Sequence, residues 1–197
     1  MIQPLALGGI TYGVSDLELT AAYAAIADGG QYRKPVFYTK VTDSKGNVLI
    51  DNTENKATQV FKASTASLLT NVMEDVLEKG TGVAARLDNM HAAGKTGTTN
   101  EAKDLVFAGF TPYYTAAIWA TYDTHAEFPE SDREFHKRLW AKVMNEIHEG
   151  LADMDFETSA TVQEATICTK TGLLARSSCP SITCLLYTSP SPRDYAA

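Results

Sequence analysis

Two strand-like stretches on either side of a proline turn constrain the fold of this chain more than any other feature. Residues 104–110 (DLVFAGF) and 114–122 (YTAAIWATY) are rich in β-branched, aromatic and small side chains, a composition typical of strands. Thr111 and Pro112 lie between them and supply the residues of a tight turn. The pattern predicts a two-stranded hairpin within an antiparallel sheet.

The segment before this hairpin, GKTGTT at 94–99, contains the letters of a phosphate-binding loop. Such a loop needs a glycine five residues before Gly-Lys-Thr, because its backbone N–H groups must surround a phosphate, and Asn89 occupies that position. A helix should also follow the lysine, whereas strand sequences follow here. We therefore predict that residues 95–98 lie on a third strand of the sheet, beside residues 106–110.

Two segments before the sheet are predicted to be helices. Residues 17–27 follow a capping box formed by Ser15 and Glu18, and two glycines end the segment. A second helix is predicted before Gly80. Its apolar residues recur at helical spacing, and we expect all of them in the core: Leu68, Leu69, Val72, Met73, Val76 and Leu77. Between the two helices, residues 36–42 and 48–50 flank a polar loop and predict a β-hairpin.

A third helix is predicted after the sheet region, where Ser131 and Glu134 form a second capping box. Its apolar stripe should pack on the sheet and consists of Phe135, Leu139, Val143 and Ile147. These elements indicate an α+β fold, an antiparallel sheet with packed helices, over residues 1–150. Residues 151–183 contain no long periodic segment and are interpreted as the start of a linker or small module.

Charge and hydropathy exclude several classes of function. The formal net charge is −7 and no segment concentrates Lys and Arg, so we expect no nucleic-acid partner. No apolar run approaches the roughly 20 residues that cross a bilayer. The N-terminus (MIQPLALGG) lacks a basic region followed by an apolar core. The acidic stretch around His125, Glu127, Glu130 and Asp132 is interpreted as a solvated loop before a helix, not as a metal site.

Lys95-Thr96-Gly97-Thr98 on a strand resembles the third active-site motif of penicillin-binding proteins and serine β-lactamases, whose other motifs are Ser-x-x-Lys and Ser-x-Asn. Four ordered segments are similar to bifunctional class A penicillin-binding proteins: residues 6–30, 79–86, 93–123 and 168–180. The resemblance covers nearly all of the chain up to residue 183. It implies that residues 1–150 are the C-terminal part of a transpeptidase domain.

In that family a serine attacks the carbonyl between the two terminal D-alanines of a peptidoglycan stem peptide, and an amine of a neighbouring strand resolves the acyl-enzyme into a crosslink. β-Lactams acylate the same serine. The resemblance implies a catalytic role in proton transfer for Lys95 and substrate binding by Thr96, Gly97 and Thr98. The Thr98 hydroxyl would bind the terminal carboxylate, and its backbone N–H would be an oxyanion-hole donor. Stem peptides and β-lactams are the implied partners, and no cofactor is implied.

No serine of the chain has Lys at the third following position or Asn at the second, so the nucleophile and both other motifs are absent from this sequence. In the family they lie upstream, with a glycosyltransferase domain and a membrane anchor. We therefore expect a fragment, inactive alone, of a protein at the extracytoplasmic face of a bacterial plasma membrane. Two alternatives stay open: a D,D-carboxypeptidase or β-lactamase that passes the acyl group to water, and a non-catalytic penicillin or peptidoglycan sensor.

The three cysteines, Cys168, Cys179 and Cys184, lie near the end of the chain. Residues 184–194 (CLLYTSPSPRD) resemble the translation of a sequencing adaptor, so residues 184–197 are interpreted as an artefact, and residues 187–197 should make few contacts. Cys168 and Cys179 then either pair in an oxidising setting or remain two unpaired small residues. A second Lys-Thr-Gly at 170–172 lies between them and is interpreted as non-catalytic, since no strand and hairpin follow it.

Overall fold

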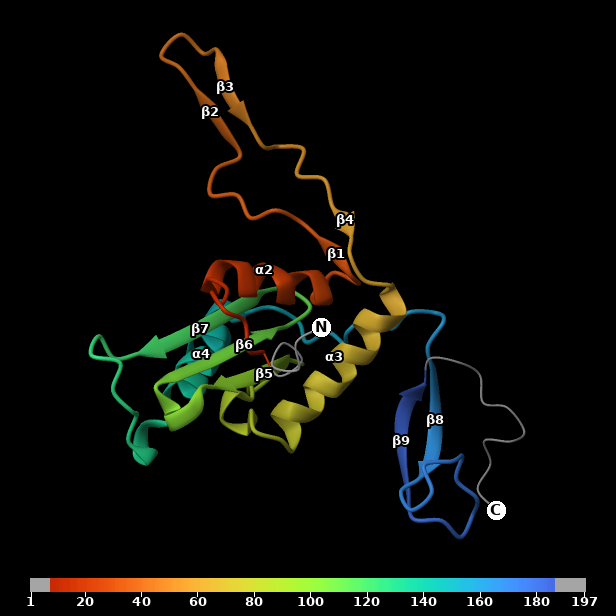
Figure 1. Ribbon diagram of the computed structural model, residues 1–197. Helices are drawn as coiled ribbons and strands as arrows, with labels where there is room; N and C mark the ends of the chain where they lie inside the picture. Colours follow the sequence, from red (N-terminus) through yellow and green to blue (C-terminus); the bar gives the residue numbers. More distant parts are fainter. Residues whose placement is uncertain (1–7, 187–197) are drawn as a thin grey trace.

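A central antiparallel sheet in the order β5-β6-β7 organises the chain (Figure 1). The computed structural model describes residues 8–186. The helices of this part are α2 (Asp16–Ala27), α3 (Ala63–Glu78), α4 (Phe135–Ile147) and three short 3₁₀ turns, η1 (Val83–Ala85), η2 (Asn100–Ala102) and η3 (Glu130–Asp132). The strands are β1 (Gln31–Tyr32), β2 (Lys40–Thr42), β3 (Val48–Asp51), β4 (Thr58–Gln59), β5 (Ala93–Thr98), β6 (Asp104–Phe110), β7 (Thr115–Thr121), β8 (Gln163–Cys168) and β9 (Ser181–Leu186).

The three central strands confirm the sheet predicted from the sequence. β5 pairs with β6 and β6 with β7, both antiparallel, so that Lys95 lies opposite Ala108 and Thr98 opposite Leu105. Thr111 closes the predicted turn, since its N–H donates to the carbonyl of Tyr114 at 2.9 Å. β6 is the central strand, and within residues 8–186 the other edge of β5 has no partner strand.

Helices cover both faces of this sheet. Phe107 contacts Trp140 of α4 edge to face with ring centroids 4.9 Å apart, and Phe110 contacts Tyr23 of α2 at 6.5 Å. Phe107 and Phe110 are three positions apart on one strand, so their rings occupy opposite faces. α4 therefore lies behind the sheet and α2 in front of it, with α3 beside β5 (Figure 1).

The capping box predicted for α2 is confirmed. The Glu18 N–H donates to the Ser15 hydroxyl at 3.3 Å, and the Ser15 N–H donates to the Glu18 carboxylate at 2.8 Å. These two bonds satisfy N–H groups that the helix itself leaves unpaired, so α2 begins where the sequence indicates.

The buried face of α3 differs from the prediction, because small and polar residues occupy most of it. Leu77 is buried, but Leu69 is 37% and Val72 64% exposed. The buried positions are Ser64, Ala66, Ser67, Thr70 and Leu77. The Ser67 hydroxyl accepts the N–H of Ser159 at 2.9 Å, so the chain after α4 passes along this small-residue face. The expectation that all six apolar residues lie in the core was wrong.

The second predicted capping box is also wrong, because α4 has Glu134 as its N-cap. Ser131 lies in η3, where its hydroxyl donates to the Asp132 carboxylate at 2.9 Å. The Nε of Arg133 donates to the carbonyl of Phe128 at 3.2 Å. This bond holds the chain in a turn ahead of the helix, so the helix begins after the position that the box indicates.

α4 packs on the sheet as predicted, but through a different stripe. Trp140 and Met144 are buried, whereas the four residues of the predicted stripe, Phe135, Leu139, Val143 and Ile147, are 41–46% exposed. Successive residues of a helix are about 100° apart, so the two stripes adjoin. The large ring of Trp140 fills the space against Phe107, and this contact sets the rotation of the helix.

Hairpins extend from the central unit at two places (Figure 1). The predicted hairpin is confirmed as β2–β3, and the Asp43 carboxylate receives the N–H groups of Lys45 and Asn47 at 2.8 and 2.9 Å across its loop. β8–β9 forms a second antiparallel hairpin, where the sequence indicated no long periodic segment. Half of its strand residues are exposed and Cys168 alone is buried among them, so no apolar periodicity accompanies these strands.

Two predictions about the ends of the chain remain. The contacts of residues 187–197 fall outside the described residues, and the division of the chain at residues 150 and 183 stays a prediction. Between residues 8 and 186, the structure contains no helix with the length and apolar character that crossing a membrane requires.

Candidate active site

Strand β5, which carries Lys-Thr-Gly, presents backbone groups along its open edge. The N–H of Thr99 donates to the carbonyl of Asp104 at 3.1 Å, just beyond the last pair of the β5–β6 ladder. In an antiparallel ladder, residues that bond to the partner strand alternate with residues that do not. Gly97 and Lys95, two and four positions before Thr99, therefore direct their backbone groups to β6. The N–H groups of Thr96 and Thr98 point to the open edge.

Lys95 and Thr96 make local contacts at this edge. The Nζ of Lys95 is exposed and donates to the carbonyl of Thr96 at 2.9 Å and to its hydroxyl at 3.3 Å. The Thr96 hydroxyl is also 2.8 Å from the hydroxyl of Thr81, in the loop after α3. Within residues 8–186, the exposed hydroxyl of Thr98 takes part in no hydrogen bond.

A groove of ≈ 900 Å³ opens at the C-terminal end of β5. Its lining includes Gly97, Thr98, Thr99, Asn100, Asp104 and His125. The surface above Gly97 is open, because a Cβ there would meet only the Cβ of Val106, at 3.4 Å. The structure thus brings Gly97 and Thr98 to the groove, while Lys95 and Thr96 lie farther along the same strand edge.

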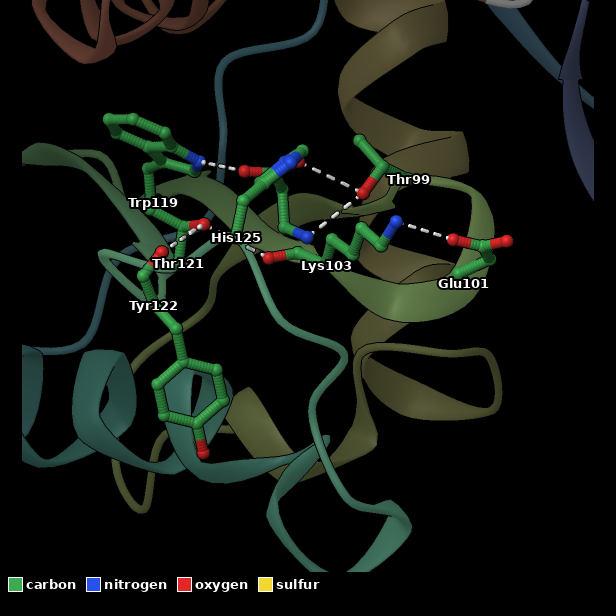
Figure 2. Close-up of polar contacts among 8 residues, drawn as sticks. Thr99, Glu101, Lys103, Trp119, Thr121, Tyr122 and His125 are labelled. Carbon is green, nitrogen blue, oxygen red and sulfur yellow. Dashed lines mark hydrogen bonds and ion pairs between the residues drawn. The ribbon is translucent and has the colours of Figure 1, made fainter.

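Asp104 joins three elements around this groove. Its carboxylate accepts the hydroxyl of Thr99 at 3.0 Å and the indole N–H of Trp119 at 3.1 Å, and it lies 3.3 Å from Nε2 of His125. These side chains come from the end of β5, from β7 and from the loop after β7, and they converge on the carboxylate (Figure 2). Its side chain is only 17% exposed, so the carboxylate acts as a shared anchor for the rim of the groove.

The surroundings of Asp104 hold the pKa of its carboxyl group below the ordinary value. Partial burial acts in the opposite direction, but hydrogen bonds from Trp119, His125 and Thr99 outweigh it. Each of these partners stabilises the charged form. The rim of the groove therefore carries a negative charge at neutral pH.

The turn between β5 and β6 is strained. Glu101 and Ala102 have φ angles of 62° and 49°, in the left-handed region that residues with a Cβ rarely adopt. Ala102 is buried against Leu105 and Phe128, and Lys103 pairs with Glu101 at 2.6 Å (Figure 2). Such a conformation persists only where its surroundings fix it. The turn therefore holds Thr98 and the following residues in one place beside the groove.

Sequence reasoning missed the residues that support the predicted site. Thr81, Thr99 and Asp104 touch or orient the Lys-Thr-Gly strand, and none of them belongs to the motif. Thr99 and Asp104 flank a short polar segment between two predicted strands. Their place at the two ends of this turn is the sequence feature that could have identified them. Trp119 lies directly opposite Val106 on the neighbouring strand, and its indole is largely exposed. An aromatic side chain is thus present on this surface beside Val106.

Cys168 and Cys179, for which the sequence left pairing open, are not among the residues that line this groove. Cys168 ends β8 and is buried, and Cys179 lies in the loop that leads to β9. The second Lys-Thr-Gly forms a turn next to Cys168, since the N–H of Gly172 donates to the Cys168 carbonyl at 2.8 Å. It lies on no strand, in contrast to residues 95–97.

Comparison with known proteins identifies the family. The family model described as "Penicillin binding protein transpeptidase domain" matches residues 3–149. The chain is 34% identical over 172 residues to penicillin-binding protein 1A of Clostridium perfringens, an alignment that covers 87% of this chain and 20% of the relative. It is 41% identical over 123 residues to penicillin-binding protein 4 of Bacillus subtilis, covering 62% of this chain and 20% of that protein. The chain thus spans about a fifth of the length of these relatives.

Solved structures agree in fold. Penicillin-binding protein 1A of Haemophilus influenzae superposes with a TM-score of 0.73 at 20% identity, over 90% of this chain and 33% of that one. PonA1 of Mycobacterium tuberculosis, solved in complex with penicillin V, superposes with a TM-score of 0.62 at 26% identity, over 71% of this chain and 39% of that one. With the family model covering most of its length, the chain belongs to the penicillin-binding protein transpeptidase family.

Proposed function

We propose that this chain supplies the substrate-binding strand of a peptidoglycan D,D-transpeptidase. The observation that carries the proposal is the open edge of β5, to which the N–H groups of Thr96 and Thr98 are directed, with a groove at the Thr98 end of the strand. An extended peptide adds to such an edge as a further strand, through main-chain hydrogen bonds. The match to the transpeptidase family supports a D-alanyl-D-alanine stem peptide as the ligand, and β-lactams as its competitors.

Thr98 and Gly97 have the properties that this ligand requires. Gly97 leaves room for a substrate backbone, since a Cβ at this position would project into open space beside Val106. The unbonded hydroxyl of Thr98 is available for the terminal carboxylate of the peptide. Its N–H, directed to the open edge, is placed to stabilise the negative charge on the attacked carbonyl oxygen, an interaction whose loss typically costs about 3 kcal/mol.

Lys95 supplies positive charge to the same edge. Its Nζ is exposed, and its hydrogen bonds are to Thr96, a neighbour that brings no opposing charge. It is therefore available to a serine hydroxyl or a substrate carboxylate that lies against this strand edge. We assign it to proton transfer during acylation, with Thr96 holding the ammonium group close to the strand.

The reaction needs a nucleophile that this sequence does not contain. A serine hydroxyl attacks the carbonyl carbon between the two D-alanines, the amide C–N bond breaks, and the terminal D-alanine leaves with the serine proton. An amine of a second stem peptide then attacks the ester and regenerates the serine. No Ser-x-x-Lys occurs in these 197 residues, so we infer that the serine belongs to a longer protein, acting in the cell wall outside the plasma membrane.

Labelling with a fluorescent penicillin tests this proposal. The proteins compared are the 197-residue chain and a protein extended upstream to the length of its relatives, with the serine of its Ser-x-x-Lys motif present. Fluorescence on a denaturing gel reports covalent acylation. We expect a labelled band from the extended protein and none from the chain alone, because no activated serine is present in it.

Lys95→Ala and Lys170→Ala form a matched pair in the extended protein, since each removes the lysine of one Lys-Thr-Gly. Lys95→Ala should abolish labelling, and Lys170→Ala should leave it unchanged. A labelled band from the 197-residue chain, or equal labelling of the two variants, contradicts the proposal.

A further inference from the structure

The loop between β8 and β9 folds back on Cys168 from both sides. On one side, the Cys168 N–H donates to the carbonyl of Leu173 at 2.7 Å, and Ile167 forms a bridge with Leu174. On the other side, the N–H of Thr169 donates to the carbonyl of Pro180 at 2.9 Å. The residue before that proline is Cys179, so the loop returns the second cysteine to the first.

The backbone of the loop brings the two cysteines near each other. The Thr171 hydroxyl and the Cys179 thiol lie close enough to the Cys168 thiol to lower its pKa. Cys168 is 2% exposed, and Cys179 is partly exposed at the surface of the loop. Cys184, the third thiol, lies opposite Ala165 on the paired strands, three register positions away from Cys168.

The second Lys-Thr-Gly forms the wall around the Cys168 sulfur. Its turn is closed by the Gly172 N–H, which donates to the Cys168 carbonyl at 2.8 Å, and Gly172 has a φ of 72° that suits glycine. This turn keeps the Thr171 hydroxyl and the Lys170 N–H near enough to the sulfur to lower the pKa of Cys168. The motif thus has a role here that is unrelated to a substrate-binding strand.

We propose that Cys168 and Cys179 form a redox-active dithiol, in which Cys179 is the entry thiol, Cys168 is the resolving thiol and residues 170–172 position the resolving sulfur. The co-reactant is a small disulfide such as oxidised glutathione. The Cys179 thiolate attacks it, forms a mixed disulfide and releases one glutathione thiol. The Cys168 thiolate then attacks the Cys179 sulfur and releases the second glutathione thiol. Two protein thiols are oxidised and one glutathione disulfide is reduced to two thiols.

The assignment of the two roles follows from exposure and from acidity. An external disulfide reaches Cys179 and not the buried Cys168. The Thr171 hydroxyl, the Cys179 thiol and the Lys170 N–H lower the pKa of Cys168 to about 7, so much of it is thiolate at neutral pH. The inference does not depend on the proposed transpeptidase function.

Oxidation of the 197-residue chain with oxidised glutathione tests the proposal, with free thiols counted by maleimide labelling and the bridge located by peptide mass mapping. We expect two of the three thiols to be lost, in a monomer, with a Cys168–Cys179 bridge. Cys184→Ser is the control and should form the same bridge. Cys179 is nearer in sequence to Cys184 than to Cys168. In concentrated urea, where the loop is unfolded, Cys179 should therefore no longer pair preferentially with Cys168.

Two variants test the roles. Cys168→Ser should accumulate glutathione at Cys179, whereas Cys179→Ser should remain largely unmodified at Cys168. In the Cys184→Ser background, Thr171→Val should slow closure of the bridge at pH 7 by up to about threefold. The loss of the Thr171 hydroxyl raises the pKa of Cys168, so a smaller fraction of this thiol is ionised, and the higher nucleophilicity of the remaining thiolate offsets part of the loss. Thr183→Val is the matched control and should not slow it. A Cys179–Cys184 bridge in the folded wild type, disulfide dimers alone, or equal glutathionylation of Cys179 in Cys168→Ser and of Cys168 in Cys179→Ser overturns the proposal.

Discussion

The hydroxyl of Thr99 lies 3.0 Å from the carboxylate of Asp104 and also accepts the backbone N–H of Asp104 at 2.9 Å. Thr99 follows the last residue of β5, and Asp104 is the first residue of β6. These two bonds therefore close the turn that holds the end of β5. The same carboxylate anchors Trp119 and His125, so the shape of the groove depends on one ionised group.

Asp104→Asn should destabilise the fold at neutral pH and weaken its acid sensitivity. Burial is outweighed by the hydrogen bonds that lower the Asp104 pKa, so the native state binds a proton less tightly than the unfolded state does. The stabilisation is present above the unfolded pKa of about 4 and is lost as pH falls through the lower native pKa. We expect a loss of about 1–2 kcal/mol at pH 7.

Urea unfolding at about pH 7 and about pH 3 measures this difference. Asp123→Asn is the control, since Asp123 is an exposed residue of the following loop. Equal pH dependence in wild type and Asp104→Asn contradicts the role given to this carboxylate.

Glu74→Gln should stabilise the chain at neutral pH. Burial on α3 raises the pKa of Glu74, and the opposing effects of His91 and Asn71 are smaller. The native state therefore binds a proton more tightly than the unfolded state. The stability that comes from binding this proton at Glu74 is fully present below about pH 4.3, and it is lost as pH rises through the higher native pKa. The variant should gain stability over wild type as pH rises from 4 toward 7.

Thermal unfolding across this pH range gives the comparison, with Glu146→Gln as the control from the exposed side of α4. If Glu74→Gln is less stable than wild type at neutral pH, the carboxylate has a favourable partner there and the argument fails.

The sequence predicted the sheet well because its signals are local. β-Branched and aromatic residues lie on both sides of Thr111, and this pattern determines β6, β7 and their turn without reference to the rest of the chain. The rotation of α3 and α4 was not predictable in the same way. It depends on Trp140 meeting Phe107 and on Ser67 meeting Ser159, which are contacts between distant segments.

The site shows the same division. The motif predicted Lys95, Gly97 and Thr98, because residue types that serve one chemistry recur at fixed spacing, and the structure places Gly97 and Thr98 at the groove. The Asp104 anchor was not predictable, since its partner Trp119 is brought near by strand register and not by spacing along the chain. The family resemblance was confirmed by the comparison, whereas the roles of the site residues remain predictions.

Met144→Ala and Val143→Ala should separate the two stripes of α4. Met144 is fully buried, so its truncation leaves a cavity and should cost about 2–5 kcal/mol. Val143 is 44% exposed and should lose much less, about 0.5 kcal/mol. Urea denaturation of the 197-residue chain distinguishes the two. Similar losses for the two variants would contradict the conclusion that α4 packs on the sheet through Trp140 and Met144 and not through the predicted stripe.

Gly94→Ala and Gly97→Ala should have opposite consequences although the residues share one strand. A Cβ at Gly94 would lie 2.7 Å from Cζ of Phe107 and 2.9 Å from the carbonyl oxygen of Ala108, so the backbone or the ring must shift. We expect a loss of about 1–3 kcal/mol in the free energy of unfolding. At Gly97 the nearest atom, the Cβ of Val106, is 3.4 Å away, an ordinary contact, and stability should change by less than about 0.5 kcal/mol.

The functional effect of this pair should run the other way. The added methyl of Gly97→Ala projects over the groove where the peptide backbone is proposed to lie, so in the upstream-extended protein it should slow acylation by fluorescent penicillin while the melting temperature is unchanged. Gly94 points to the side of the sheet that Phe107 and α4 occupy, so Gly94→Ala should lower the melting temperature and leave the acylation rate of the folded fraction near that of wild type. Normal acylation by a stable Gly97→Ala protein would mean that the ligand does not lie along β5 at this residue. A slowed reaction with an unchanged melting temperature assigns the effect to the groove itself.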